Sequence, residues 1–442
     1  MARAPLRLLL AAAFALSVPA RAADLVDIYR LAQSADAVYA GARATWAAAQ
    51  EKLPQGRAGL LPQASVAANT QINDRQINFR NPATLPSNAQ FNSNAISLSI
   101  SQPLYRRQSV IAYKQAKTQV TQADAQFAQA AQDLILRVAQ AYFNVLLARD
   151  NVNLAQAQKA AISQQLEQAK RNFEVGTATI TDTREAQARY DLTVAQEIAA
   201  ENDLEIKRRT LQQITARDVP NLAPLSTRLA LKLPDPPNMD TWVDEARQHN
   251  LLVKAAEAGV TLAREDVERS RSGHYPTLDA VASVQHLGVG SGIQGGPGYD
   301  STTKAIGVQL AIPIYQGGLV NSQVREALAN QDRAHDDLEN ARRTAELSAR
   351  QAYLGVANGL AQVKALQAAL VSTESQLEST QLGMQVGVRT QVDVLNAQQQ
   401  LYTARRDLAQ ARYNYVMSLL QLKAAVGQLT EEDLAHINRW LG

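Results

Sequence analysis

The sequence predicts an α+β membrane protein in which several copies of the chain share one β-barrel, continued by a long α-helical coiled-coil barrel. Three observations lead to this fold class. Four segments alternate apolar and polar residues with the period of a β-strand, two very long segments carry helical heptads without a proline, and the whole pattern occurs twice along the chain.

The internal two-fold repeat has an offset of 210 to 211 residues. The Pro-x-Tyr motif at 103–105 recurs at 313–315, and the Val-Gly pair at 175–176 recurs at 386–387. Each half is therefore expected to contain a helix, two strands, a very long helix, a tight turn and a shorter returning helix.

The first repeat is expected to cover 24–216, with strands at about 62–74 and 91–104, the long helix at 107–174 and the returning helix at 181–216. The second is expected to cover 241–426, with strands at about 276–287 and 303–315, the long helix at 319–385 and the returning helix at 391–426. An equatorial linker at 217–240 and a C-terminal equatorial segment at 427–442 complete the chain.

The predicted strands have one apolar and one polar face. Ile96, Leu98 and Ile100 alternate with serines, and the segment 303–315 alternates in the same way. Strands of about ten residues suit a tilted crossing of a bilayer, although a soluble hairpin packed on a core would show the same pattern. Four strands cannot close a barrel, since the smallest barrels use about eight, so several copies must contribute strands.

The two long segments have the heptad repeat of helices packed knobs-into-holes. Tyr113, Val120, Phe127 and Leu134 recur every seven residues. A helix over 107–174 would be a rod of roughly 100 Å. A short helix stacked end to end on a returning helix matches that length, which predicts a hollow cylinder of paired helices with a belt halfway along it.

The N-terminus has the features of a secretory signal peptide over 1–22. Arg3 and Arg7 precede an apolar run at 8–18, and Ala20 and Ala22 form a small-x-small cleavage pattern. No later segment is expected to be apolar over the roughly 20 residues that a membrane helix needs.

Composition excludes several classes of function. The precursor has 44 basic and 41 acidic residues, and removing the three arginines of the leader leaves 41 against 41, so no basic surplus suggests a nucleic-acid binder. The chain has no cysteine for a disulfide, a lipid anchor or a nucleophile, and its five histidines form no metal-spaced pair. We predict that it is not an enzyme, with no catalytic residue, metal or other cofactor.

The turns that join the predicted long and returning helices carry the most specific motifs. They read FEVGTATITD at 173–182 and MQVGVRTQVD at 384–393, followed by VLNA at 394–397, ARYNY at 411–415 and TEEDL at 430–434. With these motifs, essentially the whole mature chain resembles the TolC family of outer-membrane efflux proteins.

The resemblance implies a homotrimer in the outer membrane, in which twelve strands, four from each protomer, form one barrel. Twelve helical rods would form a tunnel through the periplasm, closed at its inner end. Export of small molecules or of secreted proteins would be driven by an inner-membrane pump, joined through a periplasmic adaptor. Outer-membrane lipid would surround the barrel.

The resemblance also implies roles for the residues of the two turns. Thr181 and Asp182 on one hairpin, and Arg389 on the other, occupy the positions of a polar lock that holds the entrance shut. Asp393 and Asn396 occupy those of an acidic ring at the constriction. The sequence departs from the family at Asn396, where the family has a second aspartate, and at Met384, where it has a lock tyrosine. The expected adaptor-docking tips are Val175, Gly176 and Thr177 on the first hairpin and Val386, Gly387 and Val388 on the second.

Two alternatives stay open at this stage. Asp182 and Asp393 could serve only the start of a helix, where a carboxylate suits the positive end of the helix dipole. A soluble periplasmic coiled-coil scaffold or adaptor would explain the leader and the heptads, but it would not explain four amphipathic strands placed before two long helices.

Overall fold

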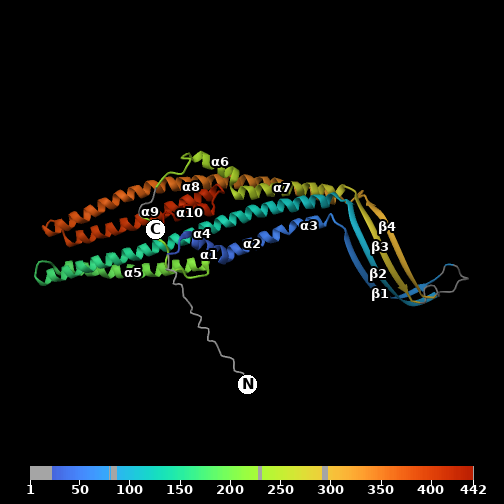
Figure 1. Cartoon of the computed structure of the whole chain (residues 1–442), viewed down its shortest axis with the longest axis horizontal. Coiled ribbons are helices and arrows are strands. Elements are labelled where there is room, and N and C mark those ends of the chain that lie inside the picture. Colours follow the sequence, from blue (N-terminus) through green and yellow to red (C-terminus); the bar gives the residue numbers. More distant parts are fainter. Residues whose placement is uncertain (1–21, 79, 81–86, 227–230, 291–296, 442) are drawn as a thin grey trace, which may run out of the picture.

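The computed structural model describes residues 22–78, 80, 87–226, 231–290 and 297–441, and the expected signal peptide falls outside these residues except at its last position. The molecule is elongated, with a β-sheet at one end and the tips of two helical hairpins at the other (Figure 1). Halfway along, the C-terminus and several short helices gather beside the long ones.

The sheet contains four antiparallel strands in the order in which they occur in the chain. These are β1 (Gln63–Ile77), β2 (Ser87–Tyr105), β3 (Thr277–Val289) and β4 (Tyr299–Ala311). The pairing of β2 with β3 joins the two halves of the chain, with Ile100 opposite Ala282. β1 and β4 are the two edges, and neither has a second neighbour among the described residues.

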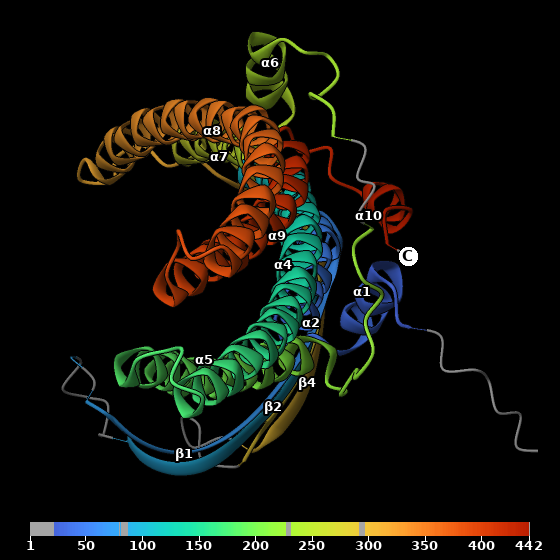
Figure 2. The ribbon, with the colours of Figure 1, turned by 90° about the vertical axis from the view of Figure 1, so that its left-hand side faces the viewer.

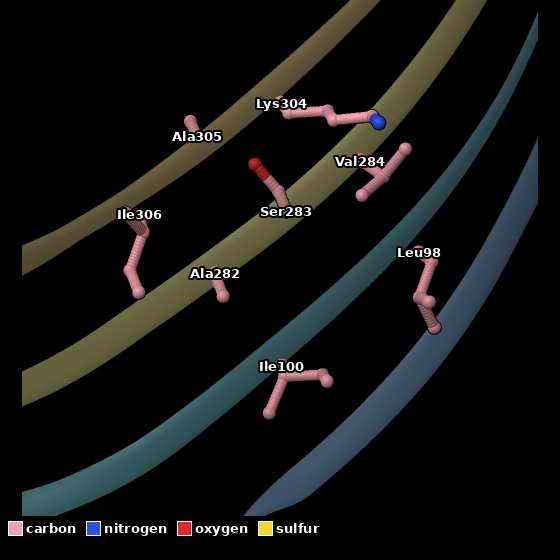
Figure 3. Close-up of a pocket in the computed structure, with 8 residues that line it drawn as sticks. All are labelled: Leu98, Ile100, Ala282, Ser283, Val284, Lys304, Ala305 and Ile306. Carbon is pink, nitrogen blue, oxygen red and sulfur yellow. The ribbon is translucent and has the colours of Figure 1, made fainter.

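One face of the sheet is apolar, because the register aligns the apolar positions of neighbouring strands. Ala64, Ile100, Ala282 and Ile306 lie opposite one another across all four strands. Figure 3 shows part of this face, a shallow hollow lined by side chains from β2, β3 and β4, with Lys304 at one edge. Ile306 is 91% exposed in the single chain, so none of the described residues covers this part of the apolar surface.

At the loop end of the sheet, each strand extends a few residues further than the sequence predicted. At the other end, β4 ends earlier than predicted. The expected strand at 303–315 is observed as Tyr299–Ala311, because Pro313 has no N–H with which to continue the ladder. The equivalent Pro103 lies beside a register shift in β2. β1 continues past residue 74 to Ile77, and β2 begins before residue 91, at Ser87. The added residues are mostly polar, among them Gln76, Asn88 and Gln90, and give no apolar alternation.

Two hairpins of very long helices form the rest of the molecule. The first joins α4 (Arg107–Glu174) to α5 (Ile180–Thr215), and the second joins α8 (Leu319–Gln385) to α9 (Gln391–Ala425). α4 packs against α5 and α9 on the tip side of the belt and against α7 on the sheet side. The hairpins of one chain therefore form a section of a curved wall (Figure 2).

The two short helical segments that precede the strands are each interrupted, although the sequence analysis expected one helix in each half. The first consists of α1 (Leu25–Ala35), α2 (Ala37–Gln50) and α3 (Lys52–Ala58), and the second of α6 (Met239–His249) and α7 (Leu251–Arg271), followed by one 3-10 turn, η1 (Ser272–His274). Two of the three breaks fall at Asp36 and Asn250, whose side chains accept hydrogen bonds from the backbone N–H groups that begin the next helix. The third, at Glu51, has no side-chain cap.

The belt halfway along the helices is tied together by residues distant in sequence. The backbone N–H of Leu25 donates to Asn438 of α10 (Glu431–Asn438) at 3.0 Å. Asp36 accepts two hydrogen bonds of 2.9 Å from the guanidinium of Arg137 on α4. The buried rings of Phe143 and Tyr413 lie 5.8 Å apart and join α4 to α9, so the main hydrophobic core lies at the belt.

The expectation that no later segment is apolar enough for a membrane helix was wrong by length and composition. An 18-residue stretch within α8 has a mean hydropathy of 1.2, and 22% of it is buried. The physical reason is that leucine, valine and alanine dominate this stretch of the helix and charged residues are few. Since α8 is 67 residues long and packs along α7 and α9, we interpret the stretch as a helix-packing surface.

Replacing Asp36 with alanine is expected to destabilise the belt by about 2–3 kcal/mol, because it removes a helix cap and leaves the partly exposed Arg137 unpaired. The hydrogen bonds from Arg137 hold the pKa of Asp36 below its ordinary value. The stabilisation is therefore complete at neutral pH and is lost as the pH falls below about 4, through the depressed folded-state value.

The measurement is thermal unfolding of the purified protein in detergent between pH 3 and pH 7. Asp133→Asn is the matched control, because Asp133 is an exposed acid one turn from Arg137. Equal melting temperatures for Asp36→Ala and the parent at pH 7 would contradict the assignment.

Candidate functional site

The tips of the two hairpins have the same backbone structure. In the second, the N–H of Gly387 donates to the carbonyl of Met384 at 3.1 Å and the N–H of Val388 to that of Gly383 at 2.9 Å. This hydrogen-bond pattern ends a helix with a left-handed residue, and Gly387 has a φ of 81°. A side chain here would be strained, since only glycine adopts this conformation readily.

The first tip repeats the pattern with different side chains. Gly176 has a φ of 77°, and its N–H donates to the carbonyl of Phe173 at 3.0 Å. The N–H and the hydroxyl of Thr177 both donate to the carbonyl of Asn172. Thr177, expected to contribute to docking, therefore also closes the turn.

Both returning helices begin with a reciprocal cap. At the start of α9, the N–H and the hydroxyl of Thr390 each donate to Oδ2 of Asp393 at 2.9 Å, while the N–H of Asp393 donates back to Thr390. Thr179 and Asp182 form the same arrangement at the start of α5. The two aspartates thus serve the helix starts, as the simpler interpretation of the sequence expected.

The charge of Asp393 is stabilised by this arrangement. The hydrogen bond from the Thr390 backbone, then the one from its hydroxyl, and finally the nearby Arg389 guanidinium lower the pKa of Asp393 below its ordinary value. The carboxylate therefore stays ionised throughout the physiological pH range.

The three expected lock residues do not meet within one chain. Among the described residues, Arg389 makes no hydrogen bond or ion pair with Thr181 or Asp182, because the two tips stand apart on separate hairpins (Figure 2). The two hydrogen bonds that Thr179 donates to Asp182 at the start of α5 both go to Oδ2 of the carboxylate. Its Oδ1 accepts no hydrogen bond from the described part of the chain.

Gly383 positions Arg389, a role that the sequence analysis missed. A Cβ placed on Gly383 would come within 2.7 Å of the Cγ of Arg389, so the aliphatic stem of the arginine packs on bare backbone. The carbonyl of Gly383 also accepts the N–H of Arg389 at 3.1 Å. The available signal was a glycine inside an otherwise uninterrupted helix, six residues before an arginine.

The tips expose apolar side chains. Val175, Val386 and Val388 are between 67% and 75% exposed, and each lies beside a glycine that makes the turn. Three valines at the far end of a molecule are more than the turn itself requires, and they form a small apolar surface on each hairpin.

Asp393 and Asn396 lie three residues apart on the first turns of α9 and so share one side of that helix. The side-chain oxygen of Asn396 accepts a hydrogen bond of 3.0 Å from Nη2 of Arg189 on α5. The sequence analysis did not single out Arg189, because an isolated arginine on a polar helix face carries no motif. Among the described residues, no cluster of side chains could hold a metal ion.

The fold and the two tips define a class of protein. A four-stranded sheet with an apolar face and open edges, continued by two helical hairpins, is the protomer of an outer-membrane channel. The outer membrane efflux protein family matches residues 29–217 and 242–428.

Curated relatives cover nearly the whole chain. The outer membrane protein TolC of Vibrio cholerae is 35% identical over 95% of this chain and 94% of the relative. TolC of Escherichia coli K12 is 36% identical over 95% of this chain and 85% of the relative. The alkaline protease secretion protein AprF of Pseudomonas aeruginosa is 30% identical over 93% of this chain and 86% of the relative.

Solved structures have the same fold. The CmeC outer membrane channel of Campylobacter jejuni superposes with a TM-score of 0.79 at 20% identity, over 95% of this chain and 90% of that one. The open state of the MtrE channel of Neisseria gonorrhoeae superposes with a TM-score of 0.73 at 20% identity, over 92% of this chain and 90% of that one.

The chain belongs to the outer membrane efflux protein family. It is an outer-membrane export channel, whose strands lie in the outer membrane and whose helices extend as a tunnel into the periplasm. The alternative of a soluble periplasmic scaffold has no support in these comparisons. The family is one of channels, not of enzymes.

Proposed function

We propose that three copies of this chain form a closed channel that exports its cargo when a periplasmic adaptor and an inner-membrane pump engage the tips. The observation that carries the proposal is the pair of open sheet edges on β1 and β4, together with an apolar sheet face that the described part of the chain leaves exposed. In lipid, unpaired backbone groups cost several kcal/mol each, so only a closed barrel is stable there.

Closure by identical copies requires β4 of one protomer to pair with β1 of the next. Three protomers supply twelve strands, and the same rotation arranges their hairpins as the wall of one tunnel. The curvature of the wall within a single chain supports this arrangement (Figure 2).

The tips are proposed as the docking surface for the adaptor. The exposed valines of both hairpins, held at the end of the molecule by Gly176 and Gly387, provide apolar contacts that a partner would cover. The relatives include a protease secretion protein and a cobalt-zinc-cadmium resistance protein. Efflux and type I secretion are therefore both open to this channel, and the pump would select the cargo.

The gate is proposed to lie between neighbouring protomers. Arg389, held on Gly383, would donate to the hydroxyl of Thr181 and to the carboxylate of Asp182 on the adjacent protomer. Met384 supplies no hydroxyl to this network, unlike the tyrosine of the family. An exposed contact of this kind contributes about 1 kcal/mol, yet three acting together would shift the closed–open equilibrium by about 3 kcal/mol.

Asp393 is proposed to line the constriction as a ring of three carboxylates. Because its caps lower its pKa, the ring would stay charged at neutral pH and favour cations over anions. Asn396 contributes a neutral amide where the family has a second carboxylate.

Substitutions at the tips are expected to abolish export without preventing assembly. Gly176→Gln together with Gly387→Gln would strain both turns and block docking, and Val388→Asp would disrupt the apolar surface while leaving the turn intact. Export is measured as resistance of cells to pump substrates, alongside the amount of heat-resistant oligomer in the outer membrane.

Gly41→Gln is the matched control for the tips, because Gly41 lies in α2 with open space around its Cα. Normal export in the double glycine variant would mean that the tips are only turns and that docking takes place elsewhere.

Replacing Arg389 with serine is expected to raise the single-channel conductance in planar bilayers, because the lock between protomers loses its guanidinium. Since the substitution removes the lock at all three protomer boundaries, the open fraction should rise by roughly 100-fold. Arg343→Ser is the matched control, since Arg343 lies on the same hairpin far from the tip and pairs with Glu339 of its own helix. Parent-like conductance in Arg389→Ser would refute the lock.

A further inference from the structure

Three side-chain hydrogen bonds join the first hairpin to the second, at the belt or between it and the tips, within the described part of one protomer. Nearest the belt, the hydroxyl of Tyr413 donates to Asp150 at 2.7 Å. Further down, the amide of Gln158 donates to Gln399 at 2.8 Å. Nearest the tips, Arg189 donates to Asn396 at 3.0 Å, and of the three bonds this is the one that joins the two returning helices, α5 and α9.

The contact between Arg189 and Asn396 differs from the other two in position and in charge. Asn396 lies one helical turn beyond Asp393, so the guanidinium is beside the proposed constriction ring. Arg189 is half-buried and, within the described part of the protomer, forms no ion pair with a carboxylate. Its positive charge is therefore not neutralised by the neutral amide that it binds.

We propose that Arg189 helps to set the opening and the charge selectivity of the tunnel entrance. It clasps the two hairpins of each protomer through Asn396, and its positive charge offsets the negative charge of the Asp393 ring. This inference rests on the proposed location of the constriction, but it does not depend on the lock formed by Arg389. The lock joins neighbouring protomers, whereas the clasp lies inside each one.

The charge of Arg189 changes what the entrance admits. Three Asp393 carboxylates alone would form a ring that concentrates cations and repels anions. Three Arg189 guanidinium groups at the same level bring the formal charge of these six groups to zero. The entrance is thus suited to anionic and zwitterionic cargo as well as to cations.

The clasp also opposes opening. Any movement that swings α9 away from α5 must break the bond between Arg189 and Asn396, whereas the contact of Tyr413 with Asp150 lies near the belt, where little movement is needed. The loss of one exposed hydrogen bond in each protomer should raise the open fraction about threefold per protomer, and so roughly 30-fold in a trimer.

The test uses the full-length channel in planar bilayers, with single-channel conductance and the reversal potential in a KCl gradient as its two readouts. Arg189→Gln should raise the conductance and shift the reversal potential toward cation preference. Asn396→Ala should raise the conductance with a much smaller shift, because the arginine stays. Asn396→Asp should keep the conductance low, since it converts the clasp into an ion pair.

Arg184→Gln is the matched control, because Arg184 is an exposed arginine on the same helix. Heat resistance of each oligomer in detergent verifies that the variants assemble. The proposal is overturned if Arg189→Gln changes neither readout by more than Arg184→Gln does. If Arg389→Ser leaves the conductance unchanged while Arg189→Gln raises it, the lock is wrong and the clasp stands; the opposite pair of results overturns the clasp alone.

Discussion

The structure depends on the two open edges of its β-sheet. β1 and β4 each present a row of backbone groups along strands of 15 and 13 residues, and the apolar face beside them suits only lipid. Because a bilayer offers no water to those groups, the edges must pair with other copies of the chain. Assembly is thus a condition of membrane insertion, and the closed ring of strands fixes the rotation that arranges the helices below as a tunnel.

The helices transmit that arrangement to the entrance. α4 begins just after β2, and α8 begins after a short connection that follows β4. Both run without interruption to the tips, while the returning helices meet the short ones at the belt. The aromatic core at Phe143 and Tyr413 and the contact of Asp36 with Arg137 hold the middle of the wall. Toward the tips, the hairpins are held by individual polar contacts, of which the one between Arg189 and Asn396 is exposed and therefore weak.

The sequence predicted the parts of this fold that follow from strong periodicity. Unbroken heptads and missing prolines indicate the long helices, and alternating isoleucine and serine indicate β2. It did not predict the breaks at Asp36 and Asn250, since a single capping side chain does not interrupt the apolar pattern. The turns were recognisable from their motifs, but Gly383 and Arg189 were not, because their roles depend on residues that only the folded hairpins bring near.

The repeat itself predicts how neighbouring protomers pair. β1 and β3 begin 214 residues apart, and Pro103 and Pro313 are 210 apart, so the observed partners Ser101 and Val281 correspond to Ala311 of β4 and Ala67 of β1. Because the chain has no cysteine, a disulfide between Ala67→Cys and Ala311→Cys reports this contact alone. Oxidation in membranes should give a covalent trimer and nothing larger, whereas Ala67→Cys with Ser301→Cys, displaced by about 33 Å along the strand, should remain uncrosslinked. A product that stays monomeric, or a ladder that continues beyond three, would contradict the shared barrel.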